Sequence, residues 1–347
     1  MIYPRLLINK DKLWNNILCA TKLCDKHNLE IVGVTKAVNS EPELVRLFID
    51  AGIKVIADSR IFNLKKLKNL DCTKMLLRIS MMSELEDVIK YADISVQSEF
   101  KTIYELNKVA KQHSLVHKII LFIELGDLRE GFNKNELLSF FPRLLELKNI
   151  KIEGIGTNLT CYGGVIPDEK KNKELVQFVK LVETNFGIKV KIVSGGNSSS
   201  LYLLKNGKSM EGITQLRLGE SILLGRETAF GENMPGFYDD AFIVEAEIVE
   251  LKAKPSLPDG TIGMNAFGEI KKFKDRGNII RAILALGRKE IDENAILPID
   301  NKIKILDASS DYMILDMSNC DVKHKIGDNL LFKLKYGSLV RVFNNNI

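Results

Sequence analysis

Short apolar runs rich in β-branched residues alternate with longer amphipathic stretches between residues 31 and 218. This alternation is typical of βα units, in which helices cover a parallel sheet. The candidate strands number about eight, which is the number that closes a (β/α)8 barrel of the TIM type. They span residues 31–35, 54–57, 74–78, 94–97, 118–124, 152–157, 191–193 and 215–218. An open, doubly wound sheet is the alternative, but the Gly-x-Gly-x-x-Gly fingerprint usual after its first strand is absent.

The pattern changes after Pro235, where turns rich in Gly, Asp, Asn and Pro separate alternating runs with little helical periodicity. The chain has 347 residues, and a single hydrophobic core stops growing at roughly 250–300 residues. We therefore predict a barrel domain over residues 1–235 and a mostly-β domain over residues 236–347, with Leu6-Leu7-Ile8 as a candidate extra strand of the β domain. The runs expected as strands of this domain are 242–251, 279–286, 303–307, 312–316, 329–335 and 339–343.

Charge and composition favour a cytoplasmic enzyme without nucleic-acid or membrane partners. The net charge of +5 comes from 50 basic and 45 acidic residues that are interspersed, whereas nucleic-acid binding usually needs a clustered patch. The sequence contains no secretory signal and no apolar run near 20 residues. Five scattered cysteines and four histidines indicate neither a disulfide framework nor a metal site.

Lys36 ends the first apolar run, Ile31-Val32-Gly33-Val34-Thr35, at the predicted rim of the sheet. Taken alone, a lysine there is ordinarily a surface residue that opens a loop. A partly desolvated lysine has a lowered pKa, however, and its neutral amine is a nucleophile able to form a Schiff base. Lys36 is therefore a candidate for covalent chemistry with a carbonyl compound.

Two later loops favour a phosphorylated ligand. Barrels of this kind commonly bind phosphate in the loops after strands 7 and 8. The seventh candidate strand is followed by Ser194-Gly195-Gly196-Asn197-Ser198-Ser199-Ser200, and the eighth by Leu218-Gly219-Glu220-Ser221. Small residues, hydroxyl groups and the free amides of a helix N-terminus suit an anion. Each loop alone is also compatible with a flexible polar turn.

A phosphorylated carbonyl compound and a strand-end lysine indicate pyridoxal phosphate, although a sugar-phosphate aldolase would use the same two parts. Arg217, next to the second phosphate loop, discriminates between them. Arginine does not give up its proton, so beside a pyridine nitrogen it keeps that nitrogen unprotonated. A cofactor in this state is a weaker electron sink, which favours simple reprotonation at Cα. A surface ion pair is the plain alternative for Arg217.

The order of these motifs resembles the alanine racemase superfamily of fold type III pyridoxal-phosphate enzymes, and in particular its ornithine racemase branch. The resemblance covers most of the chain, including the β domain. The motifs that carry it are Lys36, Asp127-Leu128-Arg129-Glu130-Gly131-Phe132, Gly156-Thr157-Asn158, Asn197-Ser198 and Leu216-Arg217-Leu218-Gly219.

This resemblance implies roles for individual residues. Lys36 would bind the cofactor covalently and act as one of two proton-transfer groups, and Arg217 would hydrogen-bond the pyridine nitrogen. Arg129 would contact the cofactor hydroxyl or the substrate carboxylate. Phosphate would be bound by Ser198, Gly219, the backbone amide of Glu220, and Tyr336, for which a half-buried strand aromatic is the alternative.

The chain departs from the family pattern at three places. Asn158 stands where alanine racemases have a histidine, and Leu286-Gly287-Arg288-Lys289-Glu290 replaces the segment with the opposite-face tyrosine. The lysine that family members often carbamylate is also missing, and Glu124 is a hypothetical replacement for its carboxylate.

Because racemisation needs proton transfer on both faces of a planar intermediate, a second group is required. The candidates are Cys161 and Tyr162 in the loop after strand 6, and Ser310 or Asp311 in the β domain. Asp311 is also suited to binding the distal ammonium of a diamino acid, which would favour ornithine or lysine over alanine or serine. A small buried cysteine, a packed tyrosine and a turn aspartate are the plain alternatives.

The leading hypothesis is thus a pyridoxal-phosphate amino-acid racemase acting on ornithine, as a head-to-tail homodimer. A lyase or decarboxylase of this fold usually offers an acidic residue to the pyridine nitrogen, which Arg217 does not match. A D-threonine aldolase or D-serine dehydratase relative would usually need a metal. A non-catalytic pyridoxal-phosphate homeostasis protein is typically a barrel without a second domain.

Overall fold

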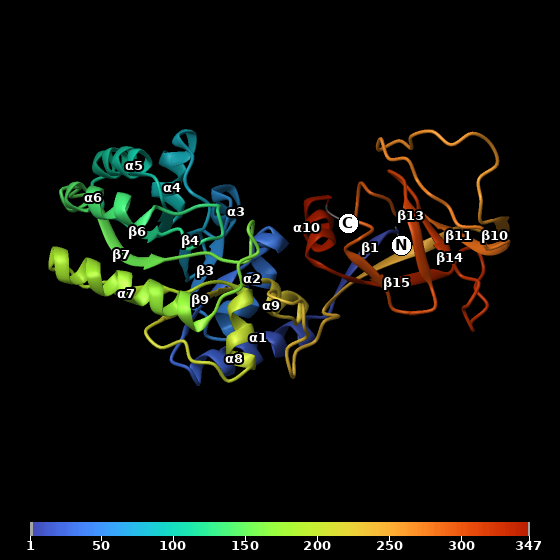
Figure 1. The fold of residues 1–347 in the computed structure, drawn as a ribbon, viewed down its shortest axis with the longest axis horizontal. Helices are drawn as coiled ribbons and strands as arrows, with labels where there is room; N and C mark the ends of the chain where they lie inside the picture. The colour runs from blue at the N-terminus through green and yellow to red at the C-terminus, as the bar shows by residue number, and fades with distance from the viewer. Residues whose placement is uncertain (1–2, 346–347) are drawn as a thin grey trace. The chain divides into compact units, whose positions relative to one another are not determined.

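The structure is a computed structural model that describes residues 3–345, and the chain divides into two compact units (Figure 1). One unit comprises Lys10–Asp239. The other joins the described residues up to Asn9 to those from Asp240 onward. The division falls after Asp239, whereas the sequence pattern places the boundary after residue 235.

The first unit is a closed barrel of eight parallel strands, β2 to β9, in which β2 pairs with β9 (Figure 1). Its interior is filled by side chains from alternate strand positions, among them Val32, Met75 and Phe122. The strands are β2 Glu30–Val34, β3 Val55–Asp58, β4 Thr73–Leu76, β5 Ile94–Gln97, β6 His117–Phe122, β7 Ile150–Gly156, β8 Ile192–Ser194 and β9 Gln215–Leu218. Such strands are buried on both faces, which is why they read as continuous apolar runs in the sequence.

Helices surround the barrel because each has one apolar face that packs on the strands. In α2, for example, Pro42 occupies the first turn and Leu44, Val45 and Phe48 are buried. The segments are α1 Lys10–Asp25, η1 Lys36–Val38, α2 Pro42–Asp50, α3 Ile61–Lys66, η2 Met82–Glu84, α4 Leu85–Tyr91, α5 Phe100–Gln112, α6 Lys134–Leu145, α7 Glu169–Phe186, η3 Ser198–Ser200, α8 Leu201–Lys205 and α9 Glu220–Leu224. Within the described residues, no helix is both long and apolar enough to cross a membrane.

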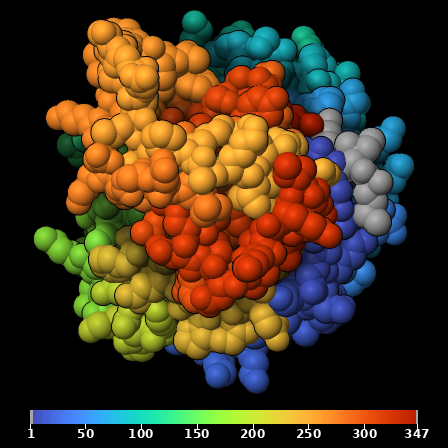
Figure 2. All heavy atoms as spheres, turned by 90° about the vertical axis from the view of Figure 1, so that its right-hand side faces the viewer, coloured from blue at the N-terminus to red at the C-terminus, as the bar shows by residue number. Residues whose placement is uncertain are grey.

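The second unit is built on an antiparallel sheet in the order β12-β15-β10-β11-β14-β13, with β1 also paired to β10. Figure 2 shows the surface of this unit in orange and red. Its elements are β1 Arg5–Ile8, β10 Phe242–Pro255, β11 Asn278–Leu284, β12 Ile296–Pro298, β13 Lys304–Ala308, β14 Met313–Asp316, β15 Asn329–Leu334 and α10 Tyr336–Asn345. The predicted TIM-type barrel followed by a mostly-β domain is confirmed.

The sequence prediction is wrong for residues 339–343, which were expected to form a strand and belong to helix α10. In that helix Leu339 and Val342 are buried, and Phe343 contacts Phe242 edge to face with ring centroids 6.1 Å apart. The apolar residues therefore follow the i, i+3 spacing of a helix rather than the alternation of a strand. Strand β12 was not expected, since it has only three residues and ends in Pro298.

Candidate active site

Lys36 lies at the carboxyl end of β2, where it begins the 3-10 turn η1. Hydroxyl hydrogen bonds hold this turn in place. Thr35 Oγ1 and Ser40 Oγ are 2.8 Å apart, and Ser40 Oγ donates to Asp58 Oδ2 at 2.7 Å. Asn39 and Ser40 both have left-handed backbone conformations, with φ of 50° and 48°. The lysine is therefore mounted on a tightly bonded turn at the mouth of the barrel.

Electrostatic effects on Lys36 identify its neighbours. Its side chain is reachable by solvent, yet protein atoms surround the ammonium group, and this desolvation is the largest effect and lowers its pKa. A thiolate at Cys161 would oppose this effect, and Arg129 lowers the pKa further. The structure thus places Lys36 within electrostatic reach of Arg129 and Cys161, both of which the sequence analysis selected.

Arg217 lies on β9 and is buried, with 4% of its surface exposed. Its guanidinium donates to Ser194 Oγ at 2.6 Å and to the carbonyl of Thr157 at 2.7 Å, and it lies 4.8 Å from the centroid of the Phe122 ring. Burial lowers its pKa to about 10, so the group remains a cation and a pure hydrogen-bond donor near neutral pH. The surface ion pair considered from the sequence is not what the structure shows.

The loops after β8 and β9 meet at Ser198. Ser198 Oγ accepts the amides of Gly219 at 3.3 Å and Ser221 at 3.1 Å, and it donates to Ser221 Oγ at 3.1 Å. A Cβ on Gly219 would lie 2.9 Å from the carbonyl oxygen of Val34, so only glycine permits this approach of the loop to β2. Clustered amide and hydroxyl donors of this kind suit a phosphate group.

Other predicted phosphate residues have partners of their own. The Glu220 carboxylate pairs with Arg226 at 2.9 Å, and burial raises its pKa, so only its backbone amide is available for an anion. The amide of Gly195 donates to the carbonyl of Gln215 at 3.0 Å within the barrel. Ser221 was not selected from the sequence, although it directly follows Glu220.

Asn158, Asn197 and Cys161 form a cluster between the loops after β7 and β8. Asn158 Nδ2 donates to Cys161 Sγ at 2.9 Å, and Asn197 Nδ2 lies 3.1 Å from Asn158 Oδ1 and 3.7 Å from the same sulfur. Arg217 Nη2 lies 3.4 Å from Asn158 Oδ1. Asn158 thus connects the arginine on β9 to the cysteine loop, where a histidine would stand in alanine racemases.

The carboxylate that binds the Arg129 guanidinium comes from Glu130, and Glu124 reaches only the backbone amide of Arg129. Both oxygens of Glu130 accept from the Arg129 guanidinium, one of them from Nη2 at 2.6 Å. Glu124 instead accepts the backbone amides of Gly126 and Arg129. Hydrogen bonding to Glu130 is the largest effect on Arg129 and raises its pKa.

Tyr162 and Cys161 share a loop that a buried carboxylate organises. Tyr162 is 75% exposed, and its backbone amide donates to Asp127 Oδ2 at 2.9 Å. The Cys161 amide also donates to Asp127. Sequence reasoning assigned no role to Asp127, although it lies in the arginine motif; a buried aspartate cannot be distinguished from a turn aspartate by sequence alone.

The remaining three predicted residues belong to the β unit. Ser310 and Asp311 form the turn between β13 and β14, where Asp311 accepts from Ser310 Oγ at 2.6 Å and pairs with Lys289 at 2.6 Å. Hydrogen bonding to Lys289 is the largest effect on Asp311 and lowers its pKa. Tyr336 is the first residue of α10.

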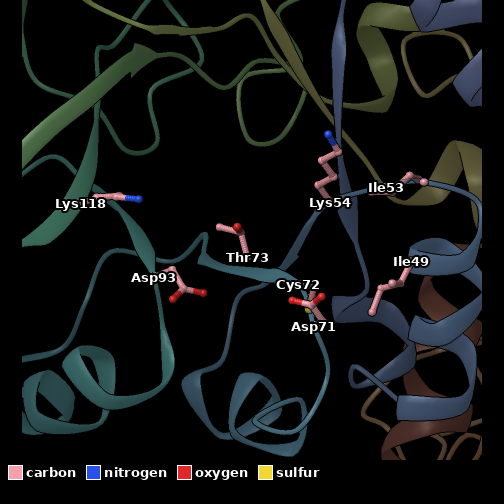
Figure 3. A pocket seen from close by; sticks show the side chains of 9 residues that line it. Ile49, Ile53, Lys54, Asp71, Cys72, Thr73, Asp93 and Lys118 are labelled. Carbon is pink, nitrogen blue, oxygen red and sulfur yellow. The ribbon is translucent and has the colours of Figure 1, made fainter.

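A separate pocket of about 600 Å³ lies at the amino ends of β3 to β6, opposite the edge that carries Lys36 (Figure 3). It is lined by charged and polar side chains, including Lys54, Thr73, Asp93 and Lys118. Catalytic groups in TIM barrels lie at the carboxyl ends of the strands, so this pocket is not the candidate site. Within residues 3–345, no cluster of three or more His, Cys, Asp or Glu side chains is arranged to bind a metal ion.

The family model for the alanine racemase N-terminal domain matches residues 8–227. The chain belongs to the alanine racemase family. An ornithine racemase from Acetoanaerobium sticklandii is 46% identical over 99% of this chain and 98% of that relative. A lysine racemase from Thermotoga maritima is 37% identical over 99% of this chain and 97% of that relative. The predicted resemblance is confirmed.

Solved structures share the fold at low identity. An alanine racemase from Bartonella henselae with covalently bound pyridoxal phosphate has a TM-score of 0.74 at 17% identity, covering 99% of this chain and 98% of that chain. A D-threonine aldolase from Filomicrobium marinum has a TM-score of 0.77 at 13% identity, covering 99% of this chain and 90% of that chain. These likenesses concern the fold alone.

Proposed function

We propose that this protein is a pyridoxal-phosphate-dependent isomerase that interconverts L- and D-ornithine. The observation that carries the proposal is the 46% identity, over 99% of the chain, to an ornithine racemase. The racemase class is supported equally by the lysine racemase, which is related over nearly its whole length. The side-chain geometry of the barrel mouth is consistent with this chemistry.

The residues present fit the cofactor. Lys36 would bind it covalently, and Arg217 would donate to the pyridine nitrogen from its buried position. The phosphate would be bound by Ser198, Gly219 and the Glu220 amide, and Tyr336 is the further donor that the family resemblance implies. Gly195, Asn158 and Asn197 would shape the surrounding loops. Bound there, pyridoxal phosphate withdraws electrons from the substrate and makes the Cα proton removable.

The protein supplies the proton-transfer groups. Lys36 serves one face of the substrate, because its lowered pKa brings its neutral amine closer to the working pH. The second face is served from the loop after β7, by Cys161 or Tyr162. Both residues are exposed. Cys161 is the better placed of the two, since its sulfur accepts a hydrogen bond from Asn158 at 2.9 Å in the cluster that also contacts Arg217.

Substrate binding follows from charge. Arg129 would bind the α-carboxylate, for which a guanidinium is well suited. Asp311, with Ser310 beside it, would exchange its ion pair with Lys289 for the distal ammonium of a diamino acid. This assignment favours ornithine and lysine over alanine and serine.

We propose further that the protein works in the cytoplasm as a head-to-tail homodimer, in which Lys10–Asp239 form the cofactor domain and the other compact unit is the β domain. The β10–β11 connection supports an interface, since it exposes Met264 at 73% and Ile270 at 68%. Exposed apolar side chains that gather in one segment can form a patch of the kind that marks contact surfaces.

The test uses full-length protein loaded with pyridoxal phosphate and incubated with L-ornithine in deuterium oxide. We expect optical rotation to disappear while deuterium enters at Cα. The visible absorption of the lysine-bound cofactor should be abolished in Lys36→Ala and retained in Lys189→Ala, a change at an exposed lysine. Chiral chromatography of lysine, alanine and serine reactions would rank the substrates. A protein that binds the cofactor but exchanges no Cα proton on any of these amino acids would instead be a homeostasis protein.

A further inference from the structure

Asp127, in the loop after β6, is enclosed by the loop after β7. Its side chain is 1% exposed. Oδ1 accepts the amides of Cys161 at 3.2 Å and Val165 at 3.3 Å, and Oδ2 accepts those of Cys161 at 3.1 Å and Tyr162 at 2.9 Å. The β7 loop therefore wraps around a single carboxylate.

The backbone of Asp127 joins the same arrangement. Its carbonyl oxygen accepts the amide of Gly163 at 2.9 Å, and a Cβ on Gly163 would lie 2.9 Å from that oxygen. Thr160 Oγ1 closes the loop by donating to the carbonyl of Val165 at 2.8 Å. Thr160 has φ of 58°, which is unfavourable for a β-branched residue. The bonds to Asp127 hold the loop in this strained form.

These contacts exclude two direct roles for Asp127. A proton-transfer group or a ligand for the substrate's distal ammonium must present an oxygen to the substrate. Both oxygens of Asp127 are occupied by backbone amides and shielded from solvent. A buried carboxylate is retained only where such donors compensate its desolvation, so its contribution lies in the conformation of the loop.

The loop that Asp127 holds carries Cys161, and its own loop carries Arg129 two residues later. Arg129 and negative charge at Cys161 both act on the Lys36 ammonium. Asp127 thus fixes the relation between the proposed carboxylate-binding arginine and the proposed second proton-transfer group.

We propose that Asp127 is a positioning residue for racemisation: it holds Cys161 at the height required to exchange a proton with the substrate face turned away from Lys36. This inference rests on the proposed racemase function. Its specific consequence is that loss of Asp127 impairs transfer on one face more than on the other.

The experiment compares cofactor-loaded Asp127→Asn with wild type. The substitution keeps the size of the side chain but replaces one accepting oxygen by an amide nitrogen that cannot accept. In deuterium oxide, the variant should still exchange the Cα proton of one ornithine enantiomer for deuterium without inverting it, because this exchange needs Lys36 alone. We expect the ratio of the inversion rate to this non-inverting exchange rate to fall at least tenfold in the variant. Asp168→Asn is the matched control, because Asp168 also accepts a backbone amide, from Lys171 at 2.6 Å, at the exposed start of α7.

A second measurement does not depend on activity. Backbone amides of residues 158–165 should exchange hydrogen at least tenfold faster in cofactor-free Asp127→Asn than in wild type, with no change in Asp168→Asn. Gly163→Ala, which displaces the loop without altering the carboxylate, should reproduce both effects if Asp127→Asn does not fold.

Three results would overturn the inference. Inversion and non-inverting exchange could fall by equal factors, which would indicate a merely structural role. Hydrogen exchange in residues 158–165 could stay at the wild-type rate. A wild-type protein that exchanges no Cα proton at all would instead reject the racemase function itself, and the inference with it.

Discussion

Arg129 lowers the pKa of Lys36, so these two residues affect covalent capture of the cofactor together. A lowered pKa means that the neutral amine forms at lower pH. We expect the rate of cofactor capture by the cofactor-free protein to rise with pH, and this rise to move to higher pH in Arg129→Gln, because a neighbouring cation has been removed. Stopped-flow absorption against pH measures the effect, with exposed Arg46→Gln as the control.

Glu130 holds the Arg129 guanidinium through Nε and Nη2. In Glu130→Gln the charge-assisted pair, worth about 1.5–3 kcal/mol, is lost and the guanidinium is no longer fixed. We expect kcat/KM for ornithine to fall roughly tenfold, which corresponds to a loss of about 1.4 kcal/mol of transition-state stabilisation. Steady-state kinetics test this, with Glu136→Gln in the capping box of α6 as the matched control. A lower KM would show that Glu130 competes with the substrate carboxylate instead of orienting its partner.

Among the elements, the loop after β9 approaches β2 closely at Gly219, beside the proposed phosphate site. Gly219→Ala would place a methyl group 2.9 Å from the Val34 carbonyl oxygen and 3.0 Å from Val34 Cβ. Overpacking of this kind costs about 1–3 kcal/mol. We expect a lower free energy of unfolding and weaker cofactor binding, measured by denaturant titration and by absorption.

The control for this change is Gly231→Ala, where no atom lies within 4 Å of the added Cβ. It should lower stability slightly, because φ there is 75°, and leave cofactor affinity unchanged. Equal loss of affinity in both variants would contradict a specific role for the Gly219 contact.

The barrel strands could be predicted from the sequence because parallel strands buried on both faces are continuous apolar runs. The loops with Lys36, Ser198 and Gly219 followed from their positions after those strands. Helix α10 could not be separated from a strand, since Leu339-Val340-Arg341-Val342-Phe343 is rich in β-branched residues and only packing selects its i, i+3 face.

Side-chain partners in the loops were less predictable. Glu124 lies five residues before Arg129 and Glu130 directly follows it, and the backbone of the loop decides which one meets the guanidinium. The hydrogen-bond donors to Asp127 come from a segment more than 30 residues later, Cys161 to Val165. Such pairings depend on two loops at once and leave no local pattern in the sequence.

For the whole molecule, a head-to-tail dimer would combine Lys36 of one protomer with Asp311 of its partner. Lys36→Ala and Asp311→Ala proteins should each be nearly inactive. After unfolding and refolding as a mixture, half of the dimers should be mixed and contain one intact site, which gives about a quarter of wild-type activity. Absence of recovery, with mixed dimers demonstrated by mass spectrometry, would place both residues in the same protomer's site.

The pairing of β1 with β10 has a consequence for biosynthesis. Leu6 of β1 pairs with Val244 of β10. In the sequence, the whole barrel is therefore inserted between two strands that are neighbours in one sheet. During translation β1 leaves the ribosome before the barrel but has no partner until the entire barrel has been made. Closing so long a loop costs chain entropy, which a folded barrel reduces by bringing its two ends together. The barrel is thus expected to fold first and serve as the template on which the β unit is completed.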